Sequence, residues 1–104
     1  MIIKKSNIKN TDLYKLATMR KDDLATIPDN AVLTITNYAI TEGKYQDGLV
    51  LQIGDGAYFT NERPIVDSFL TILSCFGTVP KLAFNLRTSN TTGKTYRVFV
   101  PVEG

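Results

Sequence analysis

The chain has 104 residues, 43% of them hydrophobic and 21% charged, with a net charge of +2. This length predicts one domain over residues 1–104, and no stretch approaches the roughly 20 apolar residues of a membrane-spanning helix. A single cysteine and no histidine exclude an internal disulfide, a cysteine-based zinc site and the usual imidazole proton shuttle, so we expect no metal, no cofactor and no enzymatic activity.

The N-terminal region is predicted to be a helical extension over residues 1–27. Its first ten residues, MIIKKSNIKN, place apolar residues before charges, the reverse of a secretory signal, so we expect a soluble cytoplasmic protein. In the following segment, NTDLYKLATMRKDDL, Asn10 or Thr11 can cap a helix, and Leu13 and Leu16 fall on one face. This pattern indicates one short amphipathic helix that covers an end of the core.

Three strands are expected after the turn IPDNA. Apolar and polar residues alternate, which is typical of strands with one wet face. In the first strand, Leu33 and Ile35 are predicted to face the core, and Tyr38 is predicted to face outward. The expected strands are AVLTITNYAIT (31–41), LVLQI (49–53) and AYFT (57–60).

A second helix is predicted in NERPIVDSFLTILSCFG, residues 61–77. Asn61 can cap it, Pro64 is tolerated in the first turn, apolar residues recur at helical spacing, and Gly77 ends it.

A β-hairpin is predicted for KLAFNLRTSNTTGKTYRVFV, residues 81–100. Its second strand is expected to turn Tyr96, Val98 and Val100 toward the core. Arg97 and Phe99 would then lie on the outer face beside Arg87.

The order helix, three strands, helix, two strands predicts a fold that is mainly β with two helices. A helix between the third and fourth of five strands is the connectivity of the OB-fold, a partly open barrel that binds oligonucleotides or oligosaccharides. We therefore expect a five-stranded OB-like barrel with a helix between strands 3 and 4 and an extra N-terminal helix. A flat five-stranded sheet with the helix on one side is the alternative.

A family resemblance covers most of the chain. The runs GLVLQIGDGAYFTNERPIVDSFLTIL and KLAFNLRTSNTTGKTYRVFVPV resemble the small single-stranded-DNA-binding proteins of bacteriophage replication modules. In that group an aromatic strand leads into a helix that begins with Ser/Thr-Asn, and a final hairpin turns at Gly-Lys or Gly-Arg. The resemblance implies non-enzymatic binding of single-stranded DNA in the host cell cytoplasm. Because the sequence ends in PVEG, we do not expect the acidic tail of the bacterial binding proteins.

Charge distribution and aromatic residues predict where such binding would occur. Residues 1–27 and 80–104 each carry a net charge of +3, and residues 28–79 carry −4. Binding of a single strand without sequence preference needs cations for the phosphates and flat rings on which the bases stack. The predicted nucleic-acid-binding residues are Tyr38, Lys44, Tyr45, Arg87, Lys94, Arg97 and Phe99.

Several alternatives stay open at this stage. Phe99 can instead pack beneath the N-terminal helix, Tyr38 can be half-buried, and the hairpin cations can be ordinary solvated charges. The expected partner is a single strand, with DNA favoured over RNA. The alternative is a phage-encoded protein-interaction module, an inhibitor or adaptor of a host or replication protein, on the same fold. A homodimer through the edges of the barrel is also compatible with the sequence.

Overall fold

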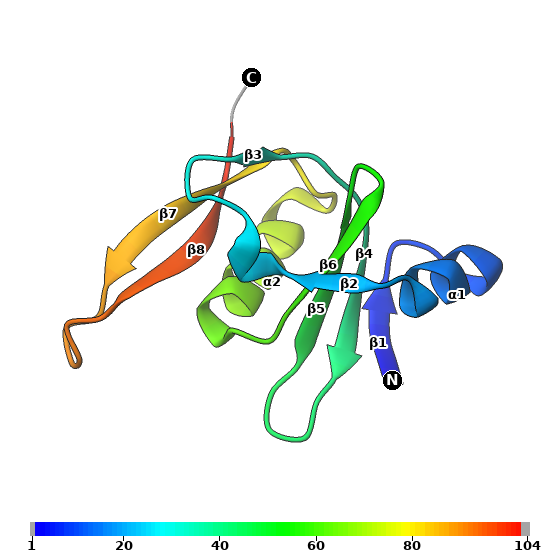
Figure 1. The fold of residues 1–104 in the computed structure, drawn as a ribbon, viewed down its shortest axis with the longest axis horizontal. Coiled ribbons are helices and arrows are strands. Elements are labelled where there is room, and N and C mark those ends of the chain that lie inside the picture. The colour runs from blue at the N-terminus through cyan, green and yellow to red at the C-terminus, as the bar shows by residue number, and fades with distance from the viewer. Residues whose placement is uncertain (1, 103–104) are drawn as a thin grey trace.

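The computed structural model describes residues 2–102, which form eight strands, two α-helices and one 3₁₀ turn (Figure 1). The strands are β1 (Ile2–Ser6), β2 (Lys21–Asp23), β3 (Val32–Leu33), β4 (Ile35–Glu42), β5 (Gly48–Ile53), β6 (Gly56–Thr60), β7 (Leu82–Thr88) and β8 (Thr95–Pro101). The helices are α1 (Asn10–Thr18), η1 (Leu24–Thr26) and α2 (Arg63–Phe76). The expectation of a mainly β protein with two α-helices is confirmed.

The strands form two sheets. The larger has the order β1-β4-β5-β6-β2, in which β2 is parallel to β6 and every other pair is antiparallel. The smaller is antiparallel with the order β3-β7-β8. Strands β3 and β4 are separated only by Thr34, so one stretch of chain contributes to both sheets. The free edge of β6 is taken by β2 and not by β8, so the described strands do not show a closed barrel, and they do not form one flat sheet.

Helix α2 supplies the main core between the sheets. Its buried residues Ile65, Phe69 and Ile72 recur at helical spacing and pack with strand residues of both sheets. The predicted end of the helix is confirmed: Gly77 adopts the left-handed conformation with φ 74°, and its N–H donates to the Leu73 carbonyl at 2.8 Å. The predicted Asn61 cap is wrong, because the N-cap position is Glu62.

Helix α1 packs on the opposite face of the larger sheet. Leu16 is fully buried against Ala39, Val50 and Ala57, whose small side chains let the helix approach closely. The helix is shorter than the predicted extension, and Lys9 takes the N-cap position that was predicted for Asn10 or Thr11. The first 27 residues also contain β1, β2 and η1, which the helical pattern did not indicate.

None of the helices within residues 2–102 is long and apolar enough to cross a membrane.

Candidate nucleic-acid interface

The register of the β7–β8 hairpin decides which side chains are available. Phe84 pairs with Phe99, Leu86 with Arg97, and Arg87 with Tyr96. Residues that lie directly opposite in an antiparallel pair project from the same face. The two arginines therefore point to opposite faces, and the prediction that they share one surface is wrong.

Phe99 is a core residue, contrary to the predicted stacking role. It is 3% exposed and stacks on Phe84, with ring centroids 5.3 Å apart and an angle of 20° between the rings. Phe69 of α2 meets it edge to face at 6.2 Å. The four-residue turn between Ser89 and Lys94 places odd-numbered residues of β8 opposite even-numbered residues of β7, so Phe99 falls on the face of Leu82 and Phe84.

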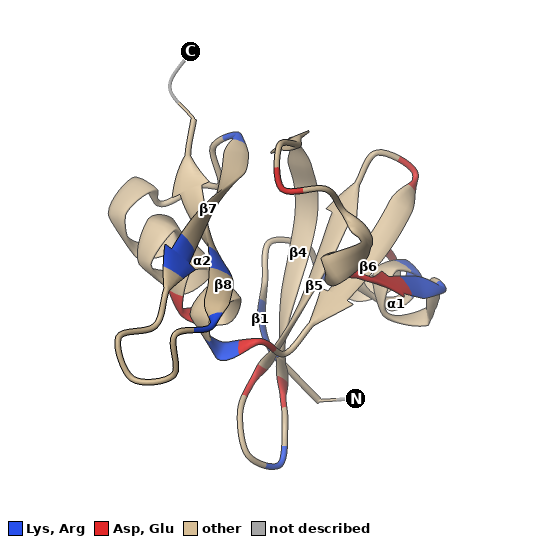
Figure 2. Cartoon of the chain, turned by 60° about the vertical axis from the view of Figure 1, so that its left-hand side comes forward, with Lys and Arg blue, Asp and Glu red and all other residues tan. Residues whose placement is uncertain are grey.

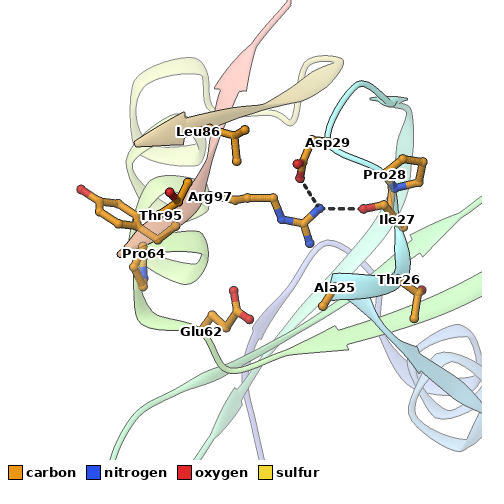
Figure 3. Close-up of a pocket in the computed structure, with 11 residues that line it drawn as sticks. Ala25, Thr26, Ile27, Pro28, Asp29, Glu62, Pro64, Leu86, Thr95 and Arg97 are labelled. Carbon is orange, nitrogen blue, oxygen red and sulfur yellow. Dashed lines mark hydrogen bonds and ion pairs between the residues drawn. The ribbon is translucent and has the colours of Figure 1, made fainter. Parts of the chain in front are cut away.

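Arg97 extends from the same inner face across the gap between β8 and η1 (Figure 3). Its guanidinium donates to the carbonyl of Ile27 at 2.7 Å and to that of Leu24 at 3.2 Å, and it lies 3.3 Å from the Asp29 carboxylate. Its Cζ also lies 4.1 Å from the centre of the Phe84 ring. The Arg97 side chain is only 12% exposed. The Arg97 side chain links β8 to the segment that contains η1, and it is therefore not free to bind phosphate.

Tyr38 is also buried, at 7% exposure, with its ring 5.3 Å from that of Phe69. A β-bulge explains the failed prediction. The pairing of β4 with β5 shifts by one residue between Ile35 and Asn37, which reverses the alternation in the rest of β4. Both Ile35 and Tyr38 therefore face the core, although they are three residues apart.

Three exposed side chains of the hairpin are of the types that bind nucleic acid, namely two cations and one aromatic ring. Arg87 is exposed on the outer face, and Tyr96, directly opposite it, is 36% exposed. Lys94 is exposed where the turn enters β8. No acidic residue occurs between positions 80 and 102, so the hairpin is uniformly basic. The prediction that Tyr96 faces the core is wrong. A four-residue turn pairs Tyr96 with Arg87 on the outer face, so the length of the turn was the signal in the sequence for this orientation.

A second aromatic group lies in the loop between β4 and β5. Tyr45 is 90% exposed, and the Lys44 ammonium lies 5.3 Å from the centre of its ring. The loop is fixed at two points: the Gln46 side chain donates to the Asn61 carbonyl, and the Lys4 ammonium lies 2.9 Å from the Asp47 carboxylate. The hydrogen bond and charge of Asp47 raise the pKa of Lys4 above its ordinary value.

The first turn of α2 lies between these two groups. Arg63 and Tyr45 line one hollow, and Pro64 and Tyr96 line the neighbouring groove. In Figures 1 and 2 the β4–β5 loop and the tip of the β7–β8 hairpin both lie in the lower part of the view, with the start of α2 between them. We call this region the tyrosine surface: it comprises Lys44, Tyr45, Arg63, Arg87, Lys94 and Tyr96.

The electrostatics of the tyrosine surface are mixed at its centre and basic at the hairpin. Arg63 is 3.7 Å from Asp67, and both side chains are largely exposed, so this pair leaves the cation accessible. Figure 2 shows basic positions on β7 and β8, and acidic positions directly beside basic ones on the segment next to α1. The acidic positions are Asp22 and Asp23 of β2, and the basic residues Arg20 and Lys21 directly precede them in the chain.

Comparison with known proteins gives no match to a family model, to a curated protein or to a solved structure.

Proposed function

We propose that the chain is a non-enzymatic single-stranded-DNA-binding protein of low sequence specificity that uses the tyrosine surface. The observation that carries this proposal is the placement of two exposed tyrosines, each beside a cation, on either side of the first turn of α2. Tyr45 and Tyr96 would stack on bases, and Lys44 and Arg87 would contact the adjoining phosphates. Arg63 and Lys94 extend the basic path.

The free energies expected from base stacking and phosphate contacts are sufficient for useful affinity for a single strand. Stacking of a base on an aromatic side chain contributes about 1–3 kcal/mol and tolerates any base, because every base has a π-face. Each phosphate contact releases counterions, so affinity falls as salt rises. Two rings and four cations therefore support binding that depends on strand form and salt and not on sequence.

The fold is consistent with an opened OB-like arrangement. The stretch formed by β3 and β4 pairs with both β5 and β7, and α2 lies between β6 and β7 in the chain. In this interpretation β2 occupies the edge where a closed barrel would place its last strand. The role in a phage or mobile-element replication module, in the host cytoplasm, rests on the sequence resemblance. The preference for DNA over RNA has the same basis.

A fluorescence titration tests the proposal. A labelled oligothymidylate is titrated with the protein at about 50 mM and about 200 mM salt, and affinity is expected to fall at the higher salt. Tyr45→Ala and Tyr96→Ala are each expected to weaken binding about 5-fold to 150-fold, the equivalent of one lost stack.

Tyr14→Ala is the matched control, because Tyr14 is 69% exposed on α1, away from the tyrosine surface. It is expected to bind like the unmodified protein. The proposal fails if no binding occurs at low salt, or if Tyr14→Ala weakens binding as much as the other two changes. Tighter binding to oligouridylate than to oligothymidylate would contradict the preference for DNA.

A further inference from the structure

Within residues 2–102, strand β8 has an edge that no other strand covers. The Val102 N–H donates to the Lys81 carbonyl and the Ser89 N–H to the Lys94 carbonyl, so even-numbered residues of β8 bond to β7. Backbone groups alternate along a strand, and the odd-numbered residues therefore direct their N–H and C=O away from β7. The smaller sheet ends at β8, so these groups have no strand partner among residues 2–102.

Helix α2 covers only part of this edge. The Phe99 N–H points outward, as the alternation requires, and donates to the Ser68 hydroxyl at 2.9 Å. Nearer the turn, the consecutive residues Thr95, Tyr96 and Arg97 line the groove between the hairpin and η1, as expected where a groove follows the edge of a strand. An edge strand with unpaired N–H and C=O groups is a template for pairing with another extended chain.

The groove next to this edge has a volume of about 780 Å³ (Figure 3). Leu86 and Pro64 supply apolar surface on one side, and Ile27 and Pro28 supply it on the other. Arg97 crosses the groove and is held by backbone carbonyls, which fixes the spacing of the two walls. The opening is therefore bordered by apolar side chains and by a row of backbone donors and acceptors.

The charged side chains that line the groove favour a basic ligand. Two carboxylates, Asp29 and Glu62, and one guanidinium, that of Arg97, line it. Arg97 is paired with Asp29, whereas Glu62 makes no ion pair within the described part of the chain. The unbalanced carboxylate favours a Lys or Arg side chain on the ligand.

We propose that the β8 edge is a docking site for an extended, basic segment of a partner protein, which adds as a fourth strand to the β3-β7-β8 sheet. Backbone hydrogen bonds to Thr95 and Arg97 hold the segment. Apolar side chains on one face of the added strand contact the groove walls, and a basic side chain pairs with Glu62. The groove shares Tyr96 with the tyrosine surface but does not include Tyr45, and the proposed docking does not depend on nucleic-acid binding.

Peptide binding followed by NMR tests the proposal. The probe is an acetylated Val-Lys-Val-Lys-Val-Lys hexapeptide. At saturation, exchange of the Thr95 and Arg97 amide protons is expected to slow at least tenfold. Two further peptides have the same side chains but are N-methylated at alternate residues, one at the odd-numbered and one at the even-numbered positions. Each has lost the N–H groups along one edge of the added strand. One of the two frames is expected to bind at least tenfold more weakly.

Proline substitutions provide a matched pair. Thr95→Pro removes an outward N–H that the β7–β8 ladder does not use, and we expect it to weaken probe binding at least tenfold. Thr88→Pro removes the corresponding outward N–H from the far edge of β7, where β3 pairs only with Leu82 and Ala83, and we expect no change. Glu62→Lys is expected to reverse the preference, so that Val-Glu-Val-Glu-Val-Glu binds better than the lysine peptide.

Several results would overturn the proposal: no saturable binding up to millimolar peptide, equal binding of all N-methylated forms, or unchanged exchange of the two amides. A stable dimer of the unmodified protein that Thr95→Pro dissociates would also overturn it, because a second copy would then occupy the edge. Tyr45→Ala separates this proposal from the proposed function. It should weaken oligonucleotide binding and leave peptide binding unchanged.

Discussion

Each face of the β7–β8 hairpin carries one arginine beside one aromatic ring, but the two pairs differ in burial and in what the arginine contacts. On the inner face, Arg97 lies over the ring of Phe84, and carbonyls and a carboxylate from another part of the chain satisfy its guanidinium. On the outer face, Arg87 lies opposite Tyr96, and both are exposed. The inner pair contributes to stability, and the outer pair is available to a ligand. Residue type alone does not distinguish the two roles. The length of the β7–β8 turn sets the pairing register, and the register decides which arginine faces the core.

The largest expected effect is the loss of the inner aromatic ring. Phe99→Ala should lower the free energy of unfolding by about 3–5 kcal/mol, because it removes a buried ring from contact with Phe84 and Phe69. Tyr96→Ala on the outer face should lower it by about 1 kcal/mol or less. Urea unfolding of both variants measures the difference. A Phe99→Ala protein with unchanged stability and lost oligonucleotide binding would reverse the assignment of the two faces.

The next effect concerns the inner arginine. Arg97→Ala should cost about 2–3 kcal/mol, because it removes charged hydrogen bonds to the Leu24 and Ile27 carbonyls. Arg97→Lys should recover only part of this loss, since one ammonium cannot reproduce the fork of a guanidinium. Both values come from urea unfolding. Full recovery by lysine would mean that charge alone, and not the bonding geometry, joins the hairpin to η1.

The outer arginine is expected to affect binding and not folding. Arg87→Ala should change the free energy of unfolding by no more than about 0.5 kcal/mol. In oligonucleotide titrations it should reduce the slope of log K against log salt concentration by about 0.7, the value for one phosphate contact on a single strand. Arg97→Ala, measured at a temperature where it is folded, should keep the original slope. Equal slopes for Arg87→Ala and the unmodified protein would exclude Arg87 from the interface.

The element types were largely predictable from the sequence. Period and turn residues located the second helix and all five expected strand segments, and Gly77 marked the end of α2 by the left-handed conformation that glycine adopts readily. Strands β1 and β2 were not predicted. Strand β2 has only three residues and is held by pairing with β6, so its existence depends on tertiary contacts that local pattern does not record.

The orientation of individual side chains was less predictable. One bulged residue in β4 turned Tyr38 inward, and the length of one turn did the same for Phe99. Each is a shift of one residue, which moves every later side chain to the other face. Lys44, Tyr45, Arg87 and Lys94 were predicted to be exposed, and they are. They lie in or beside turns, or on the side of β7 away from the core, where a shift in β4 or β8 has no effect.

The smallest expected effect concerns the loop between β4 and β5, which carries Tyr45. It tests whether the ion pair between Lys4 of β1 and Asp47 holds this loop in place. Asp47 raises the pKa of Lys4 in the folded protein, so the pair stabilises the fold fully below the unfolded pKa of lysine. This stabilisation is lost as pH rises through the higher folded pKa. The urea midpoints of the unmodified protein and of Lys4→Met should therefore differ slightly at about pH 9 and converge near pH 12. Asp47→Asn should behave like Lys4→Met. A difference that persists at the higher pH would assign the effect to packing of the lysine side chain and not to its charge. The ion pair would then not be what positions the loop, and Tyr45 would depend on the Gln46 contact alone.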